Sequence, residues 1–434
     1  MKLSSLHLHT LKEAPKDDLS INASLLIRAG FIEKLTSGVY DFLPLGLKVI
    51  RKIENIIREE MNNLGGQEIL MATLQPRQNW EGTGRWKTFN ALFKVKSQFN
   101  QWYALGPTHE EVVTPLAKKL LLSYKDLPFY LYQIQTKFRD ETRPKSGLLR
   151  TKEFIMKDLY SFHRDEKDLD DYYEKVKTGY SKIFKRLNLP VLIAEASGGT
   201  FSRYSHEFQV ITEAGEDTLY YCRHCGFCQN EEIIENKKKC PHCHHELQKI
   251  KGIEVGNIFK LKEKYSQPFH LKFKDLDSQE KFVQMGCYGI GVSRIMGAIA
   301  EISHDQNGLI WPEAVAPYQF YLLPLLSGNK KEDKEIKKQT DLLFQKIVKA
   351  RLEVLYDDRE DVTSGEKLVD ADLLGIPKRI IISSRTLQKQ SLFRAQREKR
   401  FPSDSEGFLE IKERKIKKTR LVKIKDFDKL IKIK

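Results

Sequence analysis

The stretch KFRDETRPKSGLLRTKEF, residues 137–154, carries nine charged side chains: three arginines, three lysines and three acids. In residues 131–138, which lead into it, Ile134, Thr136 and Phe138 share one face and polar side chains occupy the other, which predicts a β-strand. The segment LLRTKEFIM at its far end predicts an antiparallel partner strand. The sequence therefore places a dense group of charges at the connection between two strands of one sheet.

The charges of this connection have the chemistry of a nucleotide site. Arg139 and Arg150, on paired strands, can hold separate phosphates of one nucleotide by bidentate contacts. Glu141 can accept a hydrogen bond from an exocyclic amine, and Phe154 offers a face on which a base can stack. The alternative is a solvent-exposed hairpin with surface ion pairs, which contribute little to stability.

The length, composition and net charge indicate the number of domains and the class of partner to expect. A length of 434 residues predicts two or three domains, and 40% hydrophobic residues suffice to build their cores. The 74 lysines and arginines exceed the 59 acids by 15, which favours a polyanionic partner, nucleic acid before membrane surface. A lysine-rich genome produces the same excess. We see no export signal and no apolar run of membrane-spanning length, so we expect a cytoplasmic protein.

Hydrophobic periodicity predicts a mixed architecture. Residues 45–64 and 167–187 carry apolar side chains at three- and four-residue steps, which predicts two amphipathic helices, and a strand at EILM follows the first. Two prolines within residues 311–320 indicate a linker. Strands and helices alternate beyond it, as in a small α/β domain, and the last segment is strongly basic.

A glycine-rich segment, GCYGIGVSR at 286–294, indicates a close approach of ligand to backbone. Gly291 and Ser293 come just before Arg294 at an expected helix start, where the helix N-terminus favours anions. A glycine pattern of this kind also marks ordinary tight packing, so alone it is weak evidence.

Together these segments resemble the three signatures of class II aminoacyl-tRNA synthetases. FRDE with Arg150 and Phe154 resembles the second signature, GIGVSR the third, and the helix and strand at 45–76 the first. The resemblance covers almost the whole chain. Three further segments narrow it to the bacterial-type prolyl-tRNA synthetases: GPTHEE at 106–111, MKDLYSFH at 156–163 and SHEF at 205–208.

The resemblance implies an α+β fold, with an antiparallel class II catalytic domain, a small zinc-ribbon insertion and an α/β anticodon-binding domain. It also implies a cytoplasmic homodimer, because the first signature normally forms the subunit interface, although Ala72 stands where that signature usually has proline. The implied divisions are 1–221 and 251–312 for the two parts of the catalytic domain, 222–250 for the ribbon in place of an editing domain, and 317–434 for the anticodon-binding domain with its basic C-terminal segment.

The resemblance also implies roles for single residues. Arg139 would bind the α-phosphate of ATP and the substrate carboxylate, and Glu141 would read the adenine amine. Arg150 and Arg294 would hold the γ-phosphate end, with Arg294 over an adenine that Phe154 backs. Catalysis thus rests on Arg139, Glu141 and Arg294, and ATP binding on these three with Arg150, Phe154, Gly291 and Ser293.

For proline, the same resemblance implies a pocket that Arg139 closes at the carboxylate end. Thr108 and Glu110 would bind the imino group, His206 would wall the ring, and Cys287 would fill space beside it. Two of these assignments have an alternative from the residues alone. Glu110 at a helix start can satisfy free backbone amides, and His206 can be a hydrogen-bonded core histidine.

The implied reaction joins proline to tRNA(Pro) in two steps. The proline carboxylate attacks the ATP α-phosphorus, pyrophosphate leaves, and the adenylate passes proline to the terminal ribose of the tRNA. The nucleophile is already an anion, so charge neutralisation and positioning are needed, which arginines and Mg²⁺ supply. The alternatives are a sister class II synthetase for another amino acid and a non-catalytic tRNA-binding paralogue. THEE and SHEF argue against the first, and the triphosphate clamp argues against the second.

The crowding of five cysteines between 222 and 243 indicates a metal site in a reducing compartment. CRHC and CPHC, separated by fourteen residues, have the spacing of a structural zinc ribbon. Cysteines without metal are the alternative. The ligands we expect are Cys222, Cys225, Cys240 and Cys243, with Cys228, His242 and His244 as substitutes.

The ribbon also bears on editing. Many relatives of this family carry a large editing domain between the second and third signatures, whereas this chain has about thirty residues there. Four thiolates leave no open position on a metal for a hydrolytic water. We therefore expect no hydrolysis of alanyl-tRNA. The basic stretch 387–406 has no readable role beyond contact with tRNA as a basic loop.

Overall fold

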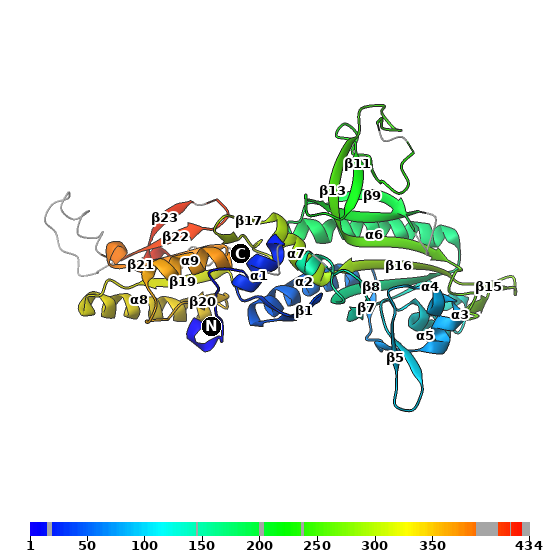
Figure 1. Ribbon diagram of the computed structural model, residues 1–434, viewed down its shortest axis with the longest axis horizontal. Coiled ribbons are helices and arrows are strands. Elements are labelled where there is room, and N and C mark those ends of the chain that lie inside the picture. Colours follow the sequence, from blue (N-terminus) through cyan, green and yellow to red (C-terminus); the bar gives the residue numbers. More distant parts are fainter. Residues whose placement is uncertain are drawn as a thin grey trace.

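The computed structural model describes residues 1–427 except 15–19, 145, 199–203, 236–237, 388–406 and 417. The stretch 387–406 therefore falls almost entirely outside the described residues. The described chain forms two parts along one long axis, a large sheet with its covering helices and a smaller α/β part (Figure 1). No helix of the described part is both long and apolar enough to cross a lipid bilayer.

The large sheet has nine strands in the described chain, in the order β10-β9-β12-β11-β13-β16-β8-β7-β3. β7 (Phe129–Phe138) and β8 (Glu153–His163) pair antiparallel, as the alternation in the sequence predicts. β16 (Gln284–Gly291) pairs with β8, and β13 (Gln248–Lys262) pairs with β16. The remaining strands are β10 (Tyr204–Ile211), β9 (Leu192–Ser197), β12 (Cys228–Asn230), β11 (Asp217–Tyr221) and β3 (Gln67–Glu68).

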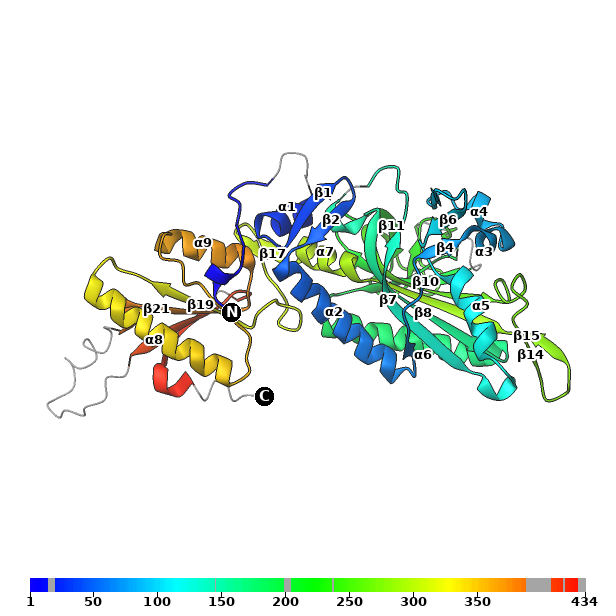
Figure 2. The same ribbon diagram turned by 90° about the horizontal axis from the view of Figure 1, so that it is seen from below.

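Three helices cover one face of this sheet: α2 (Pro44–Asn63), α6 (Glu166–Arg186) and α7 (Val292–Ile302). α2 and α6 lie beside each other across the sheet (Figure 2). Both predicted amphipathic helices are thus confirmed, because their apolar side chains are the buried ones. The sheet residues in the same core include Tyr132, Leu159 and Tyr288.

The opposite face of the sheet carries the next residues along the same strands. Leu131, Tyr160 and Cys287 form a second core with Val113 of α5 (Glu110–Leu120). This alternation follows from the pleat of a strand, in which successive side chains point to opposite faces. A small subdomain adjoins α5, made of β4 (Leu74–Pro76), α3 (Arg77–Gly82), α4 (Arg85–Thr88), β5 (Phe93–Lys96) and β6 (Trp102–Leu105).

The strand expected at EILM is shorter than the sequence predicts. β3 ends at Glu68, although the Ile69 amide still donates to the Tyr132 carbonyl at 2.8 Å. The Met71 amide then donates to the side chain of Gln133 at 3.0 Å, so a side chain replaces the next backbone partner and the ladder stops. Leu70 between them is 75% exposed.

The ribbon extends from one end of the sheet. β13 is 15 residues long, and its first half pairs with β11 while its second half pairs with β16. The cysteine-bearing loops project beyond the ends of β11 and β13 (Figure 1). One strand thus runs from the ribbon to the centre of the sheet. A small core of the ribbon contains Tyr220, Cys222, Phe227, Ile234 and Cys240.

The described residues of the C-terminal part form a five-stranded sheet in the order β20-β19-β21-β22-β23. Its first three strands are parallel and the last two antiparallel, which confirms the predicted α/β organisation. The elements are β19 (Phe320–Leu325), α8 (Lys330–Lys349), β20 (Val354–Tyr356), α9 (Ser364–Leu374), β21 (Lys378–Ser383), β22 (Phe408–Glu413) and β23 (Thr419–Lys423).

The two parts are joined by buried contacts. Arg414 of the C-terminal part donates to both carboxylate oxygens of Asp305 at 2.7 and 2.8 Å. The Met1 ammonium donates to the Val354 carbonyl at 3.0 Å, which places the start of the chain beside β20. The smaller elements near this joint and elsewhere are α1 (Ile21–Arg28), β1 (Ile32–Thr36), β2 (Val39–Phe42), β14 (Lys272–Lys274), β15 (Glu280–Phe282), β17 (His304–Asp305) and β18 (Gly308–Leu309).

Candidate active site

A cavity of about 400 Å³ lies on the face of the large sheet that α2 and α6 leave open. Arg139, Arg150 and Arg294 lie in one region of its wall, and Thr108, Glu110 and Cys287 lie in another, with Arg85 beside Glu110. The side chains predicted for ATP and proline converge there from β7, β8, β16 and the starts of α5 and α7. The predicted residues that line it are Thr108, Glu110, Arg139, Glu141, Arg150, Phe154, Cys287, Gly291 and Arg294.

Arg139 directly follows β7 and lies over the Phe154 ring, 5.0 Å from its centroid. Its Nε is buried and has no hydrogen-bond partner among the described residues. Burial lowers the pKa of Arg139, and the nearby charge of Arg294 lowers it further. Two cations held close together in a cavity, one with an unused buried donor, form a site prepared for an anion.

Glu141 and Arg150 hold each other at the edge of the cavity. Arg150 donates from Nε at 3.0 Å and Nη2 at 2.7 Å to one oxygen of Glu141, and from Nη1 to Glu216 at 2.9 Å. The hydrogen bond to Glu141 raises the pKa of Arg150. The Arg150 side chain is 41% exposed. Both groups line the cavity as predicted, and Arg150 engages only one of the two carboxylate oxygens of Glu141.

The glycine-rich segment closes the same region. Gly291 lines the cavity as the N-cap of α7, and the Nη1 of Arg294 donates to the Glu254 carbonyl at 2.7 Å. Ser293 lies outside the lining residues. Its hydroxyl accepts a hydrogen bond from the Ile155 amide at 3.1 Å and so ties the start of α7 to β8. In this structure Ser293 supports the cavity wall without facing the cavity.

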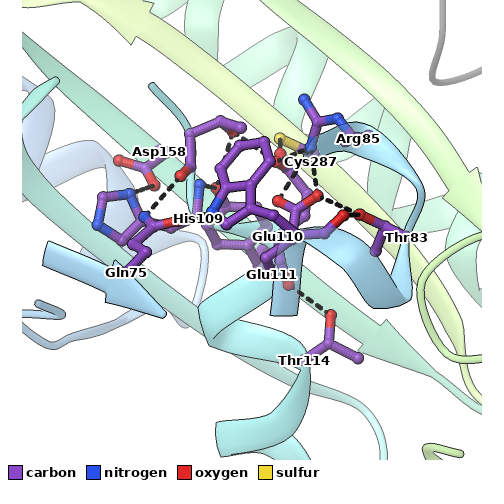
Figure 3. A network of polar contacts seen from close by, with 12 residues as sticks. Gln75, Thr83, Arg85, His109, Glu110, Glu111, Thr114, Asp158 and Cys287 are labelled. Atoms are coloured by element: carbon purple, nitrogen blue, oxygen red, sulfur yellow. Dashed lines mark hydrogen bonds and ion pairs between the residues drawn. The ribbon is translucent and has the colours of Figure 1, made fainter. Parts of the chain in front are cut away.

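A compact polar group forms the second region of the cavity (Figure 3). The Thr108 hydroxyl donates to one oxygen of Glu110 at 2.5 Å, and the Cys287 thiol donates to the other at 3.3 Å. Glu110 is fully buried at the start of α5. Burial raises the pKa of Cys287 well above its usual value, with the carboxylate of Glu110 contributing, so this cysteine stays a neutral thiol.

His206 is not brought to the cavity with the other predicted residues. Its Nδ1 shares a 2.7 Å hydrogen bond with the hydroxyl of Tyr173 on α6, which covers the helix side of the sheet. The next residue of β10, Glu207, accepts from Asn257 at 3.4 Å, and Asn257 lines the cavity. Neighbouring residues of a strand point to opposite faces, so the cavity side of β10 belongs to Glu207.

Several polar residues in and behind the cavity wall have no role assigned from the sequence, although Asp158 lies in the segment MKDLYSFH and His109 in GPTHEE. Glu254, Asn257 and Asp158 line the cavity, and Asp158 forms a buried ion pair with Lys137 at 2.7 Å. The Lys137 ammonium also contacts Nδ1 of His109 at 2.6 Å. Burial, with Lys137, lowers the pKa of His109 to about 3, so the imidazole is neutral. Glu254 and Asn257 lie in none of the quoted motifs, and their only sequence signal is a polar residue within a largely buried strand.

The four predicted metal ligands lie together in the ribbon. The sulfur atoms of Cys222 and Cys243 are 3.4 Å apart, and those of Cys225 and Cys240 are 3.5 Å apart. A tetrahedral zinc site with Zn–S bonds of ≈ 2.3 Å places its sulfurs ~3.8 Å apart, which is close to these distances. Cys228 packs in a separate apolar cluster, and His242 lies against Phe227. His224 and His245 form a second group with Cys243, which the sequence did not indicate.

Comparisons with known proteins agree with this geometry. The family described as "tRNA synthetase class II core domain (G, H, P, S and T)" matches residues 93–303, and "Anticodon binding domain" matches residues 319–433. The proline–tRNA ligase of Ehrlichia ruminantium (strain Gardel) is 39% identical over 444 residues, which cover 98% of each chain. The chain belongs to the proline–tRNA ligase family. The resemblance, the class II synthetase fold and the ligase class that the sequence predicts are thereby confirmed.

Other members of the family differ in length. The proline–tRNA ligase of Halothermothrix orenii is 34% identical over 541 residues, covering 90% of this chain and 94% of that relative. The ligase of Ehrlichia chaffeensis is 42% identical over 406 residues, covering 90% and 94%. The fold also resembles the solved prolyl-tRNA synthetase of Giardia lamblia in complex with prolyl-adenylate. That likeness has a TM-score of 0.75 at 20% identity over 93% of this chain and 74% of that one.

Proposed function

We propose that this chain activates L-proline with ATP and transfers it to tRNA(Pro) at the cavity on the open face of its large sheet. The observation that carries the proposal is the arrangement of the cavity wall. Anion-binding guanidinium groups stand in one region and a buried carboxylate in another, with Arg139 near both. An amino acid with a cationic amine and an anionic carboxylate, next to a triphosphate, matches this order of charges.

In the proposed reaction, Glu110 binds the imino group of proline, with Thr108 and Cys287 holding its two oxygens. Arg139 binds the proline carboxylate and the α-phosphate together, so that the nucleophile and its target are neutralised and aligned by one group. Phe154 backs the adenine ring and Glu141 accepts from its amine. No general base is required, since a carboxylate attacks directly.

The leaving pyrophosphate is assigned to the outer arginines. Arg150 and Arg294 take the γ-phosphate end in this proposal, and Gly291 permits close approach at the start of α7. Ser293 contributes by fixing that helix start through its hydrogen bond to Ile155. His206 is not one of the described residues that line the cavity, because its side chain is hydrogen-bonded to Tyr173 on the helix side of the sheet. In this proposal His206 therefore supports the proline pocket indirectly, by holding the strand that carries Glu207.

Mg²⁺ belongs to this proposal, and the cavity wall contains oxygen donors suited to it. Glu254 and Asn257 both line the cavity, and Asn257 Oδ1 is buried without a hydrogen-bond partner among the described residues. Carboxylate and amide oxygens are the ligands that such a hard cation takes from protein. Bound there with the nucleotide, Mg²⁺ supplies positive charge to the phosphates. Glu254 and Asn257 would hold it beside Arg294.

Structural zinc in the ribbon is likewise proposed, with Cys222, Cys225, Cys240 and Cys243 as its ligands. The chemistry of four converging thiols supports it, since a set of four cysteines is typical of closed structural zinc sites.

We also propose that the chain does not edit alanyl-tRNA. The alignment to the H. orenii relative spans 541 residues although it covers only 90% of this chain, so that relative has segments without counterpart here.

The remaining parts of the proposal concern partners. We assign the anticodon of tRNA(Pro) to the part from residue 317 onward, in agreement with the match to an anticodon-binding family. We also propose that residues 1–221 and 251–312 form the two parts of the catalytic domain and that residues 222–250 form the ribbon between them. A homodimer formed through the first signature and a cytoplasmic location complete the proposed setting.

The test of the function is proline-dependent exchange of labelled pyrophosphate into ATP, followed by aminoacylation of tRNA(Pro). Exchange with proline and charging of this tRNA is the expected outcome. A sister enzyme for another amino acid would exchange only with that amino acid. A non-catalytic tRNA-binding paralogue would bind the tRNA and exchange with none of the twenty.

A further inference from the structure

Two adjacent glutamates are fully buried at the start of α5, and a single arginine lies between their carboxylates (Figure 3). Nη1 of Arg85 donates to both oxygens of Glu111, at 2.9 and 3.0 Å, and lies 3.4 Å from an oxygen of Glu110. Glu111 is therefore its main partner, while Glu110 keeps its contacts with Thr108 and Cys287. Arg85 and Glu110 line the cavity, whereas Glu111 does not.

Arg85 is fixed in this position by its surroundings. Its side chain is 7% exposed, and its guanidinium lies 5.0 Å from the ring centroid of Trp80 and 4.9 Å from that of Phe89. Glu111 is fixed as well, because the Thr83 hydroxyl donates to its carboxylate at 2.9 Å. Thr83 and Arg85 belong to the subdomain beside α5, so this subdomain holds the two glutamates from outside the sheet.

The charges of this group are unequal. Two carboxylates contact one guanidinium, which pairs mainly with Glu111, so the Glu110 carboxylate is left for a cationic ligand in the cavity. Burial raises the pKa of Glu111 to about 7 even though Arg85 opposes the rise, and the charge of Glu110 adds to it. The buried Lys137 and the cavity-lining Arg139 also act on Glu110. Lys264 acts on both glutamates, but it is exposed, where solvent screens its charge. Without Arg85, the buried Glu111 would lose the guanidinium that pairs with it, and its charge would compete with that of Glu110.

We propose that Arg85 is a positioning residue for recognition of the substrate's cationic imino group: by pairing with Glu111, it keeps the charge of Glu111 from competing with the neighbouring Glu110, which stays aimed into the cavity. This inference rests on the proposed function, in which Glu110 binds that group. Arg85 itself does not touch the substrate in this scheme. The subdomain containing α3 and α4 would thereby contribute to amino-acid selection, although none of its residues belongs to a class II signature.

The first measurement compares Michaelis constants in pyrophosphate exchange. Arg85→Met should raise the KM for proline by about 30-fold or more, the loss of affinity expected when one partner of a buried charge pair is removed. The KM for ATP should not change, because the nucleotide region is formed by other residues. Arg77→Met is the matched control. Arg77 lies on α3 with 44% of its side chain exposed, pairs with Glu81 and lies over Trp86, so the variant should bind proline normally.

A second measurement separates charge from shape. Tetrahydrofuran-2-carboxylate has a ring oxygen in place of the imino group and therefore carries no cation. Its inhibition constant should be the same for the wild type and Arg85→Met if only the charge of Glu110 is affected. A pocket that had merely collapsed would lose affinity for this analogue and for proline alike, and that result would overturn the proposal.

The decisive variant removes the second carboxylate as well. In Arg85→Met with Glu111→Gln, Glu110 no longer faces a competing charge, so the KM for proline should recover most of the loss seen in Arg85→Met. Arg85→Lys, which keeps a single charge, should fall between the wild type and Arg85→Met. An unchanged KM in Arg85→Met, or a double variant as weak as Arg85→Met, would contradict the inference. Failure of the wild type to exchange with proline would instead contradict the proposed function itself.

Discussion

Arg139 stacks on Phe154 because β7 and β8 pair with Lys137 directly opposite Phe154. The guanidinium of the first residue after β7 is thereby placed over the ring of a residue in β8, next to the cavity. This register places Arg139, the proposed cation for the reacting groups, beside the ring of Phe154, on which the adenine is proposed to stack. A shift of one residue would turn Phe154 to the other side of the sheet.

The first prediction tests that arrangement. Arg139→Ala should lower the rate of proline-dependent pyrophosphate exchange by about 10²- to 10³-fold, the effect of removing one donor that stabilises developing charge. Arg143→Ala is the control, since Arg143 is exposed in the same turn and lies outside the cavity lining. Near wild-type exchange by Arg139→Ala would show that this stretch has another role.

The second prediction concerns the metal. Cys222→Ser with Cys240→Ser should release zinc from the purified protein, whereas His224→Ala with His245→Ala should retain it. The reason is that four cysteines make a complete ligand set for structural zinc, while the two histidines are exposed. Metal content is measured by elemental analysis and free thiols by titration. Equal zinc loss in the two double variants would mean that the histidines are ligands.

The sequence predicts those features that depend on neighbouring residues, and it does not predict those that depend on contacts between distant segments. α2 and α6 follow from periodicity, and the β7–β8 pair follows from alternation, because these signals are local. The position of Arg85 has no such signal, since a short helix of four residues carries no pattern and its partners lie in α5. His206 shows the same limit, because the motif SHEF does not indicate which strand face meets the cavity.

The third prediction follows from the joint between the two parts. Every described residue that lines the cavity lies outside the C-terminal part, so a deletion of that part would leave the cavity wall itself intact. The structure argues against a clean deletion, because Leu323 and Leu355 of that part belong to the same apolar core as Phe31 and Trp311. Removal of the part should therefore lower the melting temperature and weaken activation together with aminoacylation.

Single substitutions give a cleaner measurement of this joint. Arg414→Met should lower the free energy of unfolding by about 3–5 kcal/mol, because it leaves Asp305 partly buried without its bidentate partner. Arg414→Met with Asp305→Asn should be less destabilised, since no unpaired charge remains. Arg420→Met, on exposed β23, is the control and should change stability little. Thermal unfolding distinguishes these outcomes, and equal melting temperatures for Arg414→Met and the wild type would show that the joint is weak.

The last prediction concerns errors of selection. A pocket that holds proline excludes the smaller alanine only weakly, because each missing methylene is worth about 1–3 kcal/mol. Correction then requires a second, hydrolytic site. The segment that connects β11 to β13 forms the ribbon, whose small core surrounds the cysteine cluster, and a metal site of four cysteines has no open position for water. We therefore expect the protein to form some alanyl-tRNA and to leave it intact.

Purified enzyme is mixed with alanyl-tRNA bearing the proline anticodon, and deacylation is compared with the rate in buffer. Clearance faster than in buffer would contradict the prediction. If it occurred, loss of the activity in Cys222→Ser would place the hydrolytic site in the ribbon.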